Sequence, residues 1–562
     1  MLPWAWSLLL AVLLLGPALG PGYVLSYDMV WVPDLALRPD FWGLGSGLPR
    51  AVPSDAVVAV LDEVLGGALL QKIVLLGSLV LGGVGAARLT DRSSLVAPLA
   101  AAGSYVWNPF VAERLLIGHW PVLVGYAALP WLVGQARTWR ATGLVPAALW
   151  WVLPLGSLSA SAGLVSALVV VAFAASRSPR RWALLVALVV AANAPWLVAG
   201  ALHAGSALTD PVGARVFALA DEGSVPGPLA ALGLGGAWNS EVVPGSRTGA
   251  LAWVSLALLL VLVGLGLRRW RAAVGGRDAT AYVVCWGVGW GLAVLTWASP
   301  GVTGWAGEHL PGAGLVRDGA RLLALCAPLL AAVVGHGAAR VTASLPRAAR
   351  PTAVLALLLL PVAVMPDVAL GWSGRLTATA YPADYRAARE ALRAQVAGGA
   401  GGDVLLLPLS SYRQPAWNDG HKVLDPVGRF LTPDYVAADD LFVSGRRVVG
   451  EDARVPLVAA ALEAGDAEAR ARALADLGVG FVVTEQDVGP ASDEVPDVAG
   501  TLVHDGPDLR VQRLVAVRER VTPTSWTFAV VVAWAAFGAL FVVGLVTPSR
   551  RAWVARRGPR RG

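Results

Sequence analysis

The sequence predicts an α-helical polytopic membrane protein with about twelve transmembrane helices and one small extracytoplasmic α/β domain near its C-terminus. Of its 562 residues, 56% are hydrophobic and only 15% are charged, whereas soluble domains carry about 25% charged residues. The mean hydropathy is +0.62. Apolar runs recur along the chain at close to the roughly 20 residues that a helix needs to cross a bilayer.

The individual spans follow from these apolar runs. We expect them near residues 4–25, 68–87, 93–106, 118–135, 142–156, 158–176, 182–202, 250–267, 280–298, 319–338, 351–371 and 525–546. The runs 93–106 and 142–156 are the shortest. The first run has an alternative interpretation as a signal peptide ending at Ala18-Leu19-Gly20, although it lacks a basic segment before its apolar part.

The short loops indicate the orientation, because Arg and Lys accumulate on the cytoplasmic side of a membrane protein. Arginine is concentrated in the loops 87–92, 136–141, 177–181, 268–278 and 340–350 and in the tail after residue 547. With twelve spans, all of these segments fall on the same side as both termini. We therefore expect a protein of the cytoplasmic membrane with both termini on the cytoplasmic side. The outer face then carries the segments 26–67, 107–117, 203–249, 299–318 and 372–524.

Three parts follow from this pattern: a membrane domain at 1–372, an α/β domain at 373–524, and a last span with a basic tail at 525–562. Within the middle part, DVLLLPL at 403–409 and FVVTEQD at 481–487 are typical of buried strands. TLVHDG and LRVQRLV predict a closing hairpin, while RAAREALRAQVAG and VPLVAAALEAGDAEARARALADLG have helical spacing.

Carboxylates follow the first span directly. Asp28 and Asp34 lie in SYDMVWVPDL, among interfacial aromatic residues. Such a carboxylate either serves as a general base for an acceptor hydroxyl, or holds a divalent cation such as Mg²⁺ or Mn²⁺ against a phosphate. Asp28 is the candidate metal ligand. The alternative is loop hydrogen bonding, and Asp55 has the further alternative of capping a short amphipathic helix that begins after Pro53.

A second outer segment, YVWNPFVAERLLIGHW, contributes Asn108, Glu113, Arg114 and His119. Arg114 is expected on the outer face, where the positive-inside rule makes arginine uncommon. Binding of a lipid-linked phosphate would explain this position, since guanidinium binds phosphate bidentately. The alternative is an ion pair with Glu113, Asp28 or Asp34. Lys72, the sole lysine before residue 373, either extends toward the membrane surface or contacts a phosphate.

Near the tenth span the chain reads GEHLPGAGLVRDGARLLALC. Arg317 and Asp318 have the alternative of a simple local pair. Arg321 lies one turn deeper, where a charge is costly unless it faces a polar cavity. Far along the chain, YRQPAWNDGHKVLDP is rich in polar and aromatic residues and is either a glycan- or acceptor-binding loop or an ordinary surface loop.

Together, SYDMVWVPDL, WNPFVAERLLIGHW and LVRDGARLLAL resemble the GT-C superfamily of integral membrane glycosyltransferases, and in particular actinobacterial members related to the cell-wall arabinofuranosyltransferases. The resemblance covers roughly residues 1–370 as architecture. It implies a polyprenyl-phosphate sugar donor, a cell-envelope glycan, lipid or protein acceptor, Asp28 as the base or metal-site acid, and Lys72, Arg114 and Arg321 as phosphate contacts. The first loop lacks the adjacent acidic pair of the superfamily.

Two other classes stay open. One is a lipid or polysaccharide flippase, which needs a polar path across the membrane. The other is a non-catalytic scaffold or assembly protein that has kept a GT-C-like membrane part. Nucleic acid is not an expected partner, because no basic stripe with interleaved aromatic residues is present.

Overall fold

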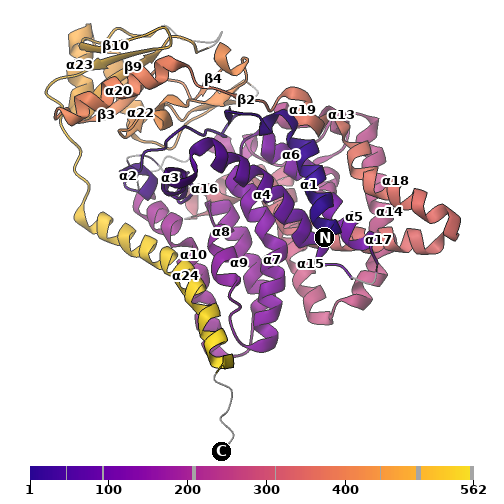
Figure 1. Cartoon of the computed structure of the whole chain (residues 1–562). Helices are drawn as coiled ribbons and strands as arrows, with labels where there is room; N and C mark the ends of the chain where they lie inside the picture. Colours follow the sequence, from indigo (N-terminus) through magenta and orange to yellow (C-terminus); the bar gives the residue numbers. More distant parts are fainter. Residues whose placement is uncertain are drawn as a thin grey trace, which may run out of the picture.

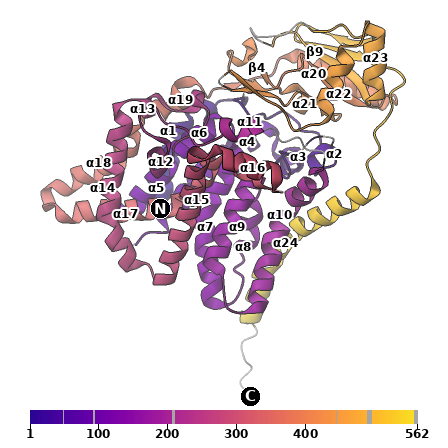
Figure 2. The same ribbon diagram turned by 180° about the vertical axis from the view of Figure 1, so that it is seen from behind.

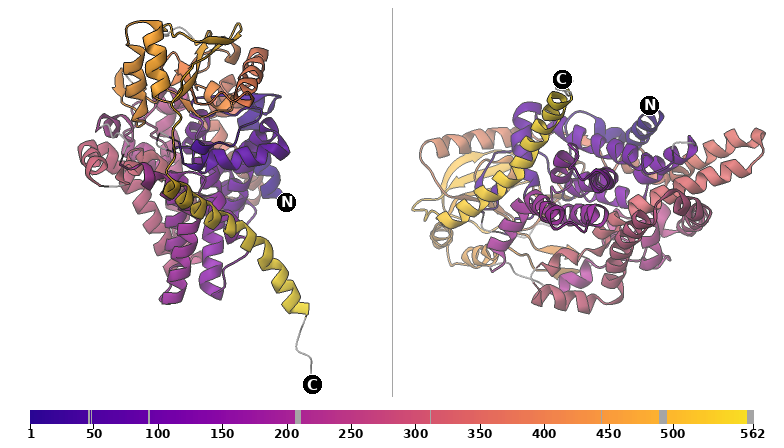
Figure 3. Two further views of the ribbon diagram at one scale, coloured as in Figure 1. Left: turned by 90° about the vertical axis from the view of Figure 1, so that its left-hand side faces the viewer. Right: turned by 90° about the horizontal axis from the view of Figure 1, so that it is seen from below.

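The computed structural model describes residues 1–45, 47, 49–91, 94–205, 211–310, 312–443, 445–488 and 495–556. Arg92 and the side chains of the predicted basic tail lie outside the described residues. The chain forms a helical bundle that bears a small α/β segment at one end, while the last helix runs back along the bundle (Figures 1 and 3).

The bundle consists of long apolar helices joined by short ones. The longer helices are α1 (Leu2–Leu15), α4 (Gly67–Ala87), α7 (Trp120–Thr142), α9 (Ala160–Ala174), α10 (Pro179–His203), α14 (Ala250–Ala273), α15 (Gly276–Ala298), α17 (Ala327–Ser344), α18 (Arg350–Val364) and α24 (Thr524–Arg556). The shorter ones include α2 (Pro39–Trp42), α3 (Ser54–Leu65), α5 (Val96–Val106), α6 (Pro109–Leu116), α8 (Leu149–Leu155), α11 (Pro211–Val216), α12 (Gly227–Ala230), α13 (Gly245–Thr248), α16 (Pro300–His309) and α19 (Ala369–Gly374).

Within the described residues, seven helices are long and apolar enough to cross a membrane, and the pair η5 (Gly319–Leu325) and α17, bent by 51°, makes an eighth if it is one span. The expected number of twelve is therefore not reached by length and composition. Four expected spans are not among these. The runs 93–106, 142–156 and 158–176 became α5, α8 and α9, with 11, 7 and 15 residues, and about 20 are needed. The run 118–135 became α7, which has 23 residues but does not pass by composition. Helix α18 has no buried residue. It contacts α14 and α17 and projects from that side of the bundle (Figure 2).

Loops that we expected on the cytoplasmic side meet at one end of the bundle. Arg137 and Arg140 both pair with Asp278, and Arg181 donates to the Arg140 carbonyl at 3.4 Å. Three of the arginine-rich loops are thus neighbours. The side of the membrane on which they lie stays a prediction.

The α/β segment, residues 378–513, contains a five-stranded sheet in the order β10-β11-β9-β3-β6. Its strands are β3 (Asp403–Leu407), β6 (Tyr435–Val436), β9 (Val479–Glu485), β10 (Thr501–Asp505) and β11 (Leu509–Arg513). The first three are parallel, and β9, β11 and β10 are antiparallel neighbours. This confirms the two expected strands and the closing hairpin.

Both faces of this sheet are covered, which explains why β3 and β9 are continuously apolar. Leu406 and Val483 pack with Leu392 of α20 (Ala383–Ala397). Leu405 and Val482 pack on the other face, in one cluster with residues of α22 (Arg454–Leu462) and α23 (Ala467–Asp476). The predicted helical stretch is therefore a helix pair.

Ion pairs fasten the α/β segment to the bundle. They join Asp34 to Arg389 and Arg393, Asp55 to Arg429, Glu241 to Lys422, and both Arg50 and Arg317 to Glu451. The expectation that Asp55 caps α3 is wrong, because no side chain caps this helix and the Asp55 carboxylate lies 2.8 Å from the Arg429 guanidinium. A long-range ion pair therefore engages the Asp55 carboxylate, for which the local sequence suggested a capping role.

Candidate functional site

Asp28 lies in a tight turn that follows the short strand β1 (Tyr23–Val24). Ser26 and Met29 exchange backbone hydrogen bonds across the turn, and Tyr27 between them has a positive φ of 47°. The Asp28 amide donates to the Ile117 carbonyl at 3.0 Å. The turn therefore holds Asp28 against the segment that follows α6.

The Asp28 carboxylate has two side-chain partners. Its Oδ2 lies 3.2 Å from His119 Nε2, and its Oδ1 accepts a hydrogen bond of 2.6 Å from the Tyr412 hydroxyl. The Asp28 side chain keeps 39% of its surface exposed. Because a carboxylate has about four acceptor sites, room for a further donor remains.

The neighbours of His119 define its tautomer. Arg114 Nη1 lies 3.2 Å from His119 Nδ1, and a guanidinium can only donate, so Nδ1 must be the unprotonated acceptor. The proton of the neutral ring is then on Nε2, where it points to Asp28. The carboxylate of Asp28 can only accept, which favours the same tautomer. Arg321 Nη2, at 3.3 Å from the same Nε2, then makes a charged contact with the ring and no hydrogen bond to it.

Two arginines share one carboxylate at this site. Arg114 donates to both oxygens of Asp318 at 3.1 and 3.4 Å, and Arg321 Nε lies 2.8 Å from Asp318 Oδ2. Arg114 is buried, whereas the Arg321 side chain is 32% exposed. Arg114 therefore pairs with Asp318, and the alternative partners Glu113, Asp28 and Asp34 are wrong. We call Asp28, Arg114, His119, Asp318 and Arg321 the Asp28 cluster.

The electrostatics of the cluster favour an ionised Asp28. Burial raises the pKa of its carboxyl, but the hydrogen bonds from His119 and Tyr412 and the charge of Arg321 outweigh burial and hold that pKa below its usual value. Asp28 is consequently a carboxylate at neutral pH. The pKa of Asp318 is lowered to about 2, because Arg114 and Arg321 overcome the effect of burial.

Four predicted site residues make contacts outside the Asp28 cluster. Asp34 pairs with Arg389 of α20 at 2.6 Å, and Arg317 pairs with Glu451. Lys72 Nζ lies 3.5 Å from Gln71 Oε1. Asn108 caps α6, accepting from the Val111 amide and donating to backbone carbonyls and to the Tyr126 hydroxyl. Their roles toward a substrate stay predictions.

Glu113 is buried beside a second acidic group. Glu222 binds Arg247 at 2.7 Å, and the pKa of the Glu113 carboxyl is raised by burial and by the charge of Glu222. Glu113 Oε1 has no hydrogen-bond partner among the described residues. This carboxyl group therefore keeps its proton more readily than an ordinary glutamate.

Sequence reasoning missed two members of the site. Asp318 was taken for a local partner of Arg317, and Tyr412 belongs to the stretch YRQPAWNDGHKVLDP, for which a surface loop was one alternative. The aromatic and polar richness of that stretch was the available signal. Its contact with Asp28 bridges 384 positions along the chain, which no local pattern encodes.

Asp28 is the residue of this site that the sequence suggests as a metal ligand. Within the described ranges, no group of three or more His, Cys, Asp or Glu side chains is placed to hold a metal ion. The side chains beside Asp28 are His119 and Arg321, and a guanidinium is a donor rather than a ligand. The divalent cation at Asp28 stays a prediction.

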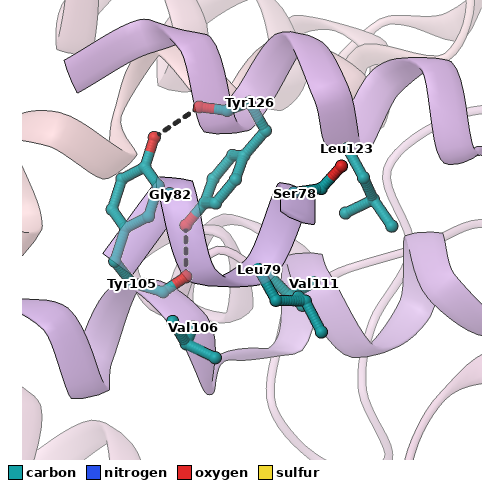
Figure 4. Close-up of a pocket in the computed structure, with 8 residues that line it drawn as sticks. All are labelled: Ser78, Leu79, Gly82, Tyr105, Val106, Val111, Leu123 and Tyr126. Atoms are coloured by element: carbon teal, nitrogen blue, oxygen red, sulfur yellow. Dashed lines mark hydrogen bonds between the residues drawn. The ribbon is translucent and has the colours of Figure 1, made fainter. Parts of the chain in front are cut away.

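Two cavities between described residues lie away from the cluster. One, lined by Ser78, Tyr105 and Tyr126 among others (Figure 4), has about 10 Å³, close to the space of one water molecule. There the hydroxyls of Tyr105 and Tyr126 donate to each other's backbone carbonyls. The other, of about 480 Å³, lies beside Leu44, Arg518 and Trp526 where α24 begins.

No protein-family model matches the sequence, and no curated protein matches it. Solved structures do. The arabinofuranosyltransferase AftD from mycobacteria, determined by cryo-EM, is 18% identical with a TM-score of 0.51, over 93% of this chain and 40% of that chain. A mutant form of AftD is 17% identical with a TM-score of 0.53, over 92% and 41%.

This likeness shows a shared fold. The protein is a helical membrane protein folded like part of a mycobacterial arabinofuranosyltransferase, and it spans about two fifths of the length of the structures that it matches. That fold was expected from the outer-loop motifs as a resemblance to GT-C enzymes. The identity is too low to transfer donor, acceptor or residue roles.

Proposed function

We propose that the protein is a membrane glycosyltransferase of the GT-C type, which moves a sugar from a polyprenyl-phosphate donor to a cell-envelope acceptor on the outer face of the cytoplasmic membrane. The carrying observation is the Asp28 carboxylate, which is ionised, partly exposed and fixed by His119 and Tyr412. The fold shared with AftD supports the same class.

The reaction is a direct displacement with inversion. An acceptor hydroxyl gives its proton to Asp28 as its oxygen attacks the anomeric carbon. The bond from that carbon to the phosphate oxygen breaks, and polyprenyl phosphate leaves with the bonding electrons. Arg321, the exposed cation of the cluster, stabilises the charge that develops on the phosphate.

No step of this proposal is routed through a divalent cation. Lys72 and the buried Arg114 are the remaining phosphate contacts that the resemblance implies, and Arg317 remains a candidate substrate-binding residue. Asp34, Asn108, Glu113 and His119 remain candidate catalytic or substrate-binding residues, and of these only His119 touches Asp28.

The test uses purified protein in lipid nanodiscs with radiolabelled decaprenyl-phospho-arabinose or a polyprenyl-phospho-mannose, and a cell-envelope glycan extract as acceptor. We expect transfer by the wild type and a loss of at least about 100-fold in Asp28→Asn, the usual range for removal of a general base. Asp505→Asn, an exposed carboxylate of β10, is the matched control. Normal transfer by Asp28→Asn would remove Asp28 from the mechanism.

A scaffold function has one observation in its favour. Asp28 and Asp318 together balance the charges of Arg114 and Arg321, so the cluster has no surplus positive charge to attract a phosphate. A scaffold predicts that no donor is consumed and that Asp28→Asn leaves assembly of its partners intact. The same assay separates the two functions.

A further inference from the structure

The first outer segment and the α/β segment are joined by backbone hydrogen bonds next to Asp28. The Tyr27 amide donates to the Lys422 carbonyl at 2.7 Å, and the Leu424 amide donates to the Tyr27 carbonyl at 2.8 Å. These bonds set Tyr27 in register with β5 (Val423–Leu424). The residue after Tyr27 is Asp28, so its position relative to β5 is fixed.

Strand β5 in turn positions Tyr412. It pairs antiparallel with β4 (Tyr412–Arg413), and Tyr412 lies opposite Leu424 in that pairing. The chain of backbone contacts from Tyr27 through Leu424 to Tyr412 is therefore continuous. The Tyr412 ring also packs edge-on against Tyr27, with centroids 6.3 Å apart.

Arg413 anchors this hairpin in the α/β segment. Its side chain is 1% exposed and binds Asp425 at 2.9 Å and Glu485 at 2.6 Å. It also donates to the Ser410 hydroxyl and carbonyl at 2.7 Å. A buried arginine with all these partners holds the adjacent Tyr412 with little freedom, because breaking one partner of such a pair is costly.

The hairpin brings one functional group to the site, the Tyr412 hydroxyl at 2.6 Å from Asp28 Oδ1. His119 holds the other oxygen, so the two donors fix the carboxylate plane from both sides. Neither donor uses up the carboxylate, since Asp28 remains 39% exposed. This is the arrangement expected of groups that orient a base and leave its free acceptor sites open.

We propose that Tyr412 is a positioning residue for Asp28, and that the α/β segment thereby forms part of the active site. The inference rests on the proposed function of Asp28 as the base. Loss of the phenol hydroxyl frees the carboxylate to rotate and removes a donor that favours its charged form. The α/β segment is consequently required for the chemistry itself, in addition to any role in holding an acceptor.

The test is Tyr412→Phe in the donor assay above, with initial rates measured as a function of pH. We expect kcat to fall roughly tenfold, as for loss of a hydrogen bond to a charged group, with little change in KM. We also expect the acid limb of kcat/KM to move up by about one pH unit, because the Asp28 carboxylate has lost a stabilising donor.

The matched control is Tyr381→Phe. The Tyr381 hydroxyl also links the α/β segment to the first outer segment, donating to the Trp31 carbonyl at 2.9 Å, but it does not contact Asp28. Its acid limb should stay in place. If both variants lose activity with an unmoved limb, Tyr412 is merely structural and the proposal is wrong.

A second substitution guards against misfolding of Tyr412→Phe. Incorporation of 3-fluorotyrosine at 412 keeps the hydroxyl and makes it a stronger donor, so the acid limb should move to lower pH. An unmoved limb would also overturn the proposal. Asp28→Asn measured in parallel separates the two levels: an active Asp28→Asn refutes the proposed function, whereas an inactive one with an unperturbed Tyr412→Phe refutes only the role of Tyr412.

Discussion

Asp318 is the residue whose loss we expect to cost the most stability near the site. Arg114 is 1% exposed at its side chain and Asp318 is 6% exposed. Both Asp318 oxygens are used by Arg114, and Arg321 lies 2.8 Å from one of them. In Asp318→Asn the buried Arg114 loses its counter-charge and faces a second guanidinium without screening. Removal of one member of a buried pair costs about 3–5 kcal/mol.

The measurement is reversible unfolding by sodium dodecyl sulfate in mixed micelles, with Glu468→Gln as control. The Glu468–Arg472 pair is 79% and 69% exposed with its charged atoms 3.6 Å apart, so its loss should change the free energy of unfolding by less than about 0.5 kcal/mol. The double variant Asp318→Asn/Arg114→Met should recover part of the loss, because no buried charge is left unpaired there. A cost below about 1 kcal/mol for Asp318→Asn would refute the reasoning.

Two further predictions concern the attachment of the α/β segment and the effect of pH. Arg38 is buried and donates to the Gly428 and Pro433 carbonyls at 2.8 and 2.7 Å. Arg38→Met should weaken this attachment by about 2 kcal/mol, which faster hydrogen exchange at residues 427–436 would report. Unchanged exchange there would contradict the prediction. Burial raises the pKa of Asp62 to about 6 while its Oδ2 accepts from the Leu35 amide. The folded state therefore favours the protonated acid, and wild-type stability falls as pH rises from about 4 to 6. Asp62→Asn keeps the acceptor and loses the charge. In the same unfolding titration, the variant should therefore be more stable than the wild type by at most about 3 kcal/mol above pH 6, and equally stable below pH 4. A gain in stability that does not depend on pH would contradict the prediction.

The sequence predicted well where local patterns decide the structure. The apolar runs of β3 and β9 and the helical spacing of α20 and α23 correspond to observed elements, because burial on both faces or on one stripe leaves a period in the chain. The expected spans at α5 and α8 were wrong because they also rested on a local apolar pattern alone. An apolar run of 14 or 15 residues does not distinguish a membrane span from a short helix buried among others.

The sequence predicted most residues of the candidate site, but it did not predict which of them contact one another. Charge alternation placed Asp28, Arg114, His119 and Arg321 on one face, and the structure brings these four together. The partner of Arg114 is Asp318, 204 positions away. Residue spacing carries no information about such a contact, so the sequence suggested the adjacent Glu113 and the outer-loop carboxylates Asp28 and Asp34 instead.

The outer-rim charges divide into two kinds once their partners are known. Arg317, Asp34 and Asp55 bind residues of the α/β segment, so these three charges attach that segment to the bundle. Members of the Asp28 cluster pair mainly with one another, and only Asp28 and Arg321 are substantially exposed, at 39% and 32%.

This division identifies the group that must move when a phosphate binds. Two aspartates and two arginines give the cluster no net charge, so a phosphate anion adds an unbalanced negative charge to a partly buried site. Arg114 is held bidentately by Asp318 and is buried. Among the residues that the structure describes, the Arg321 side chain has only long polar contacts besides Asp318, at 3.4 Å to Ser161 and 3.3 Å to His119. Arg321 is therefore the guanidinium that can turn from Asp318 to a lipid phosphate, while Arg114 remains to neutralise the carboxylate left behind.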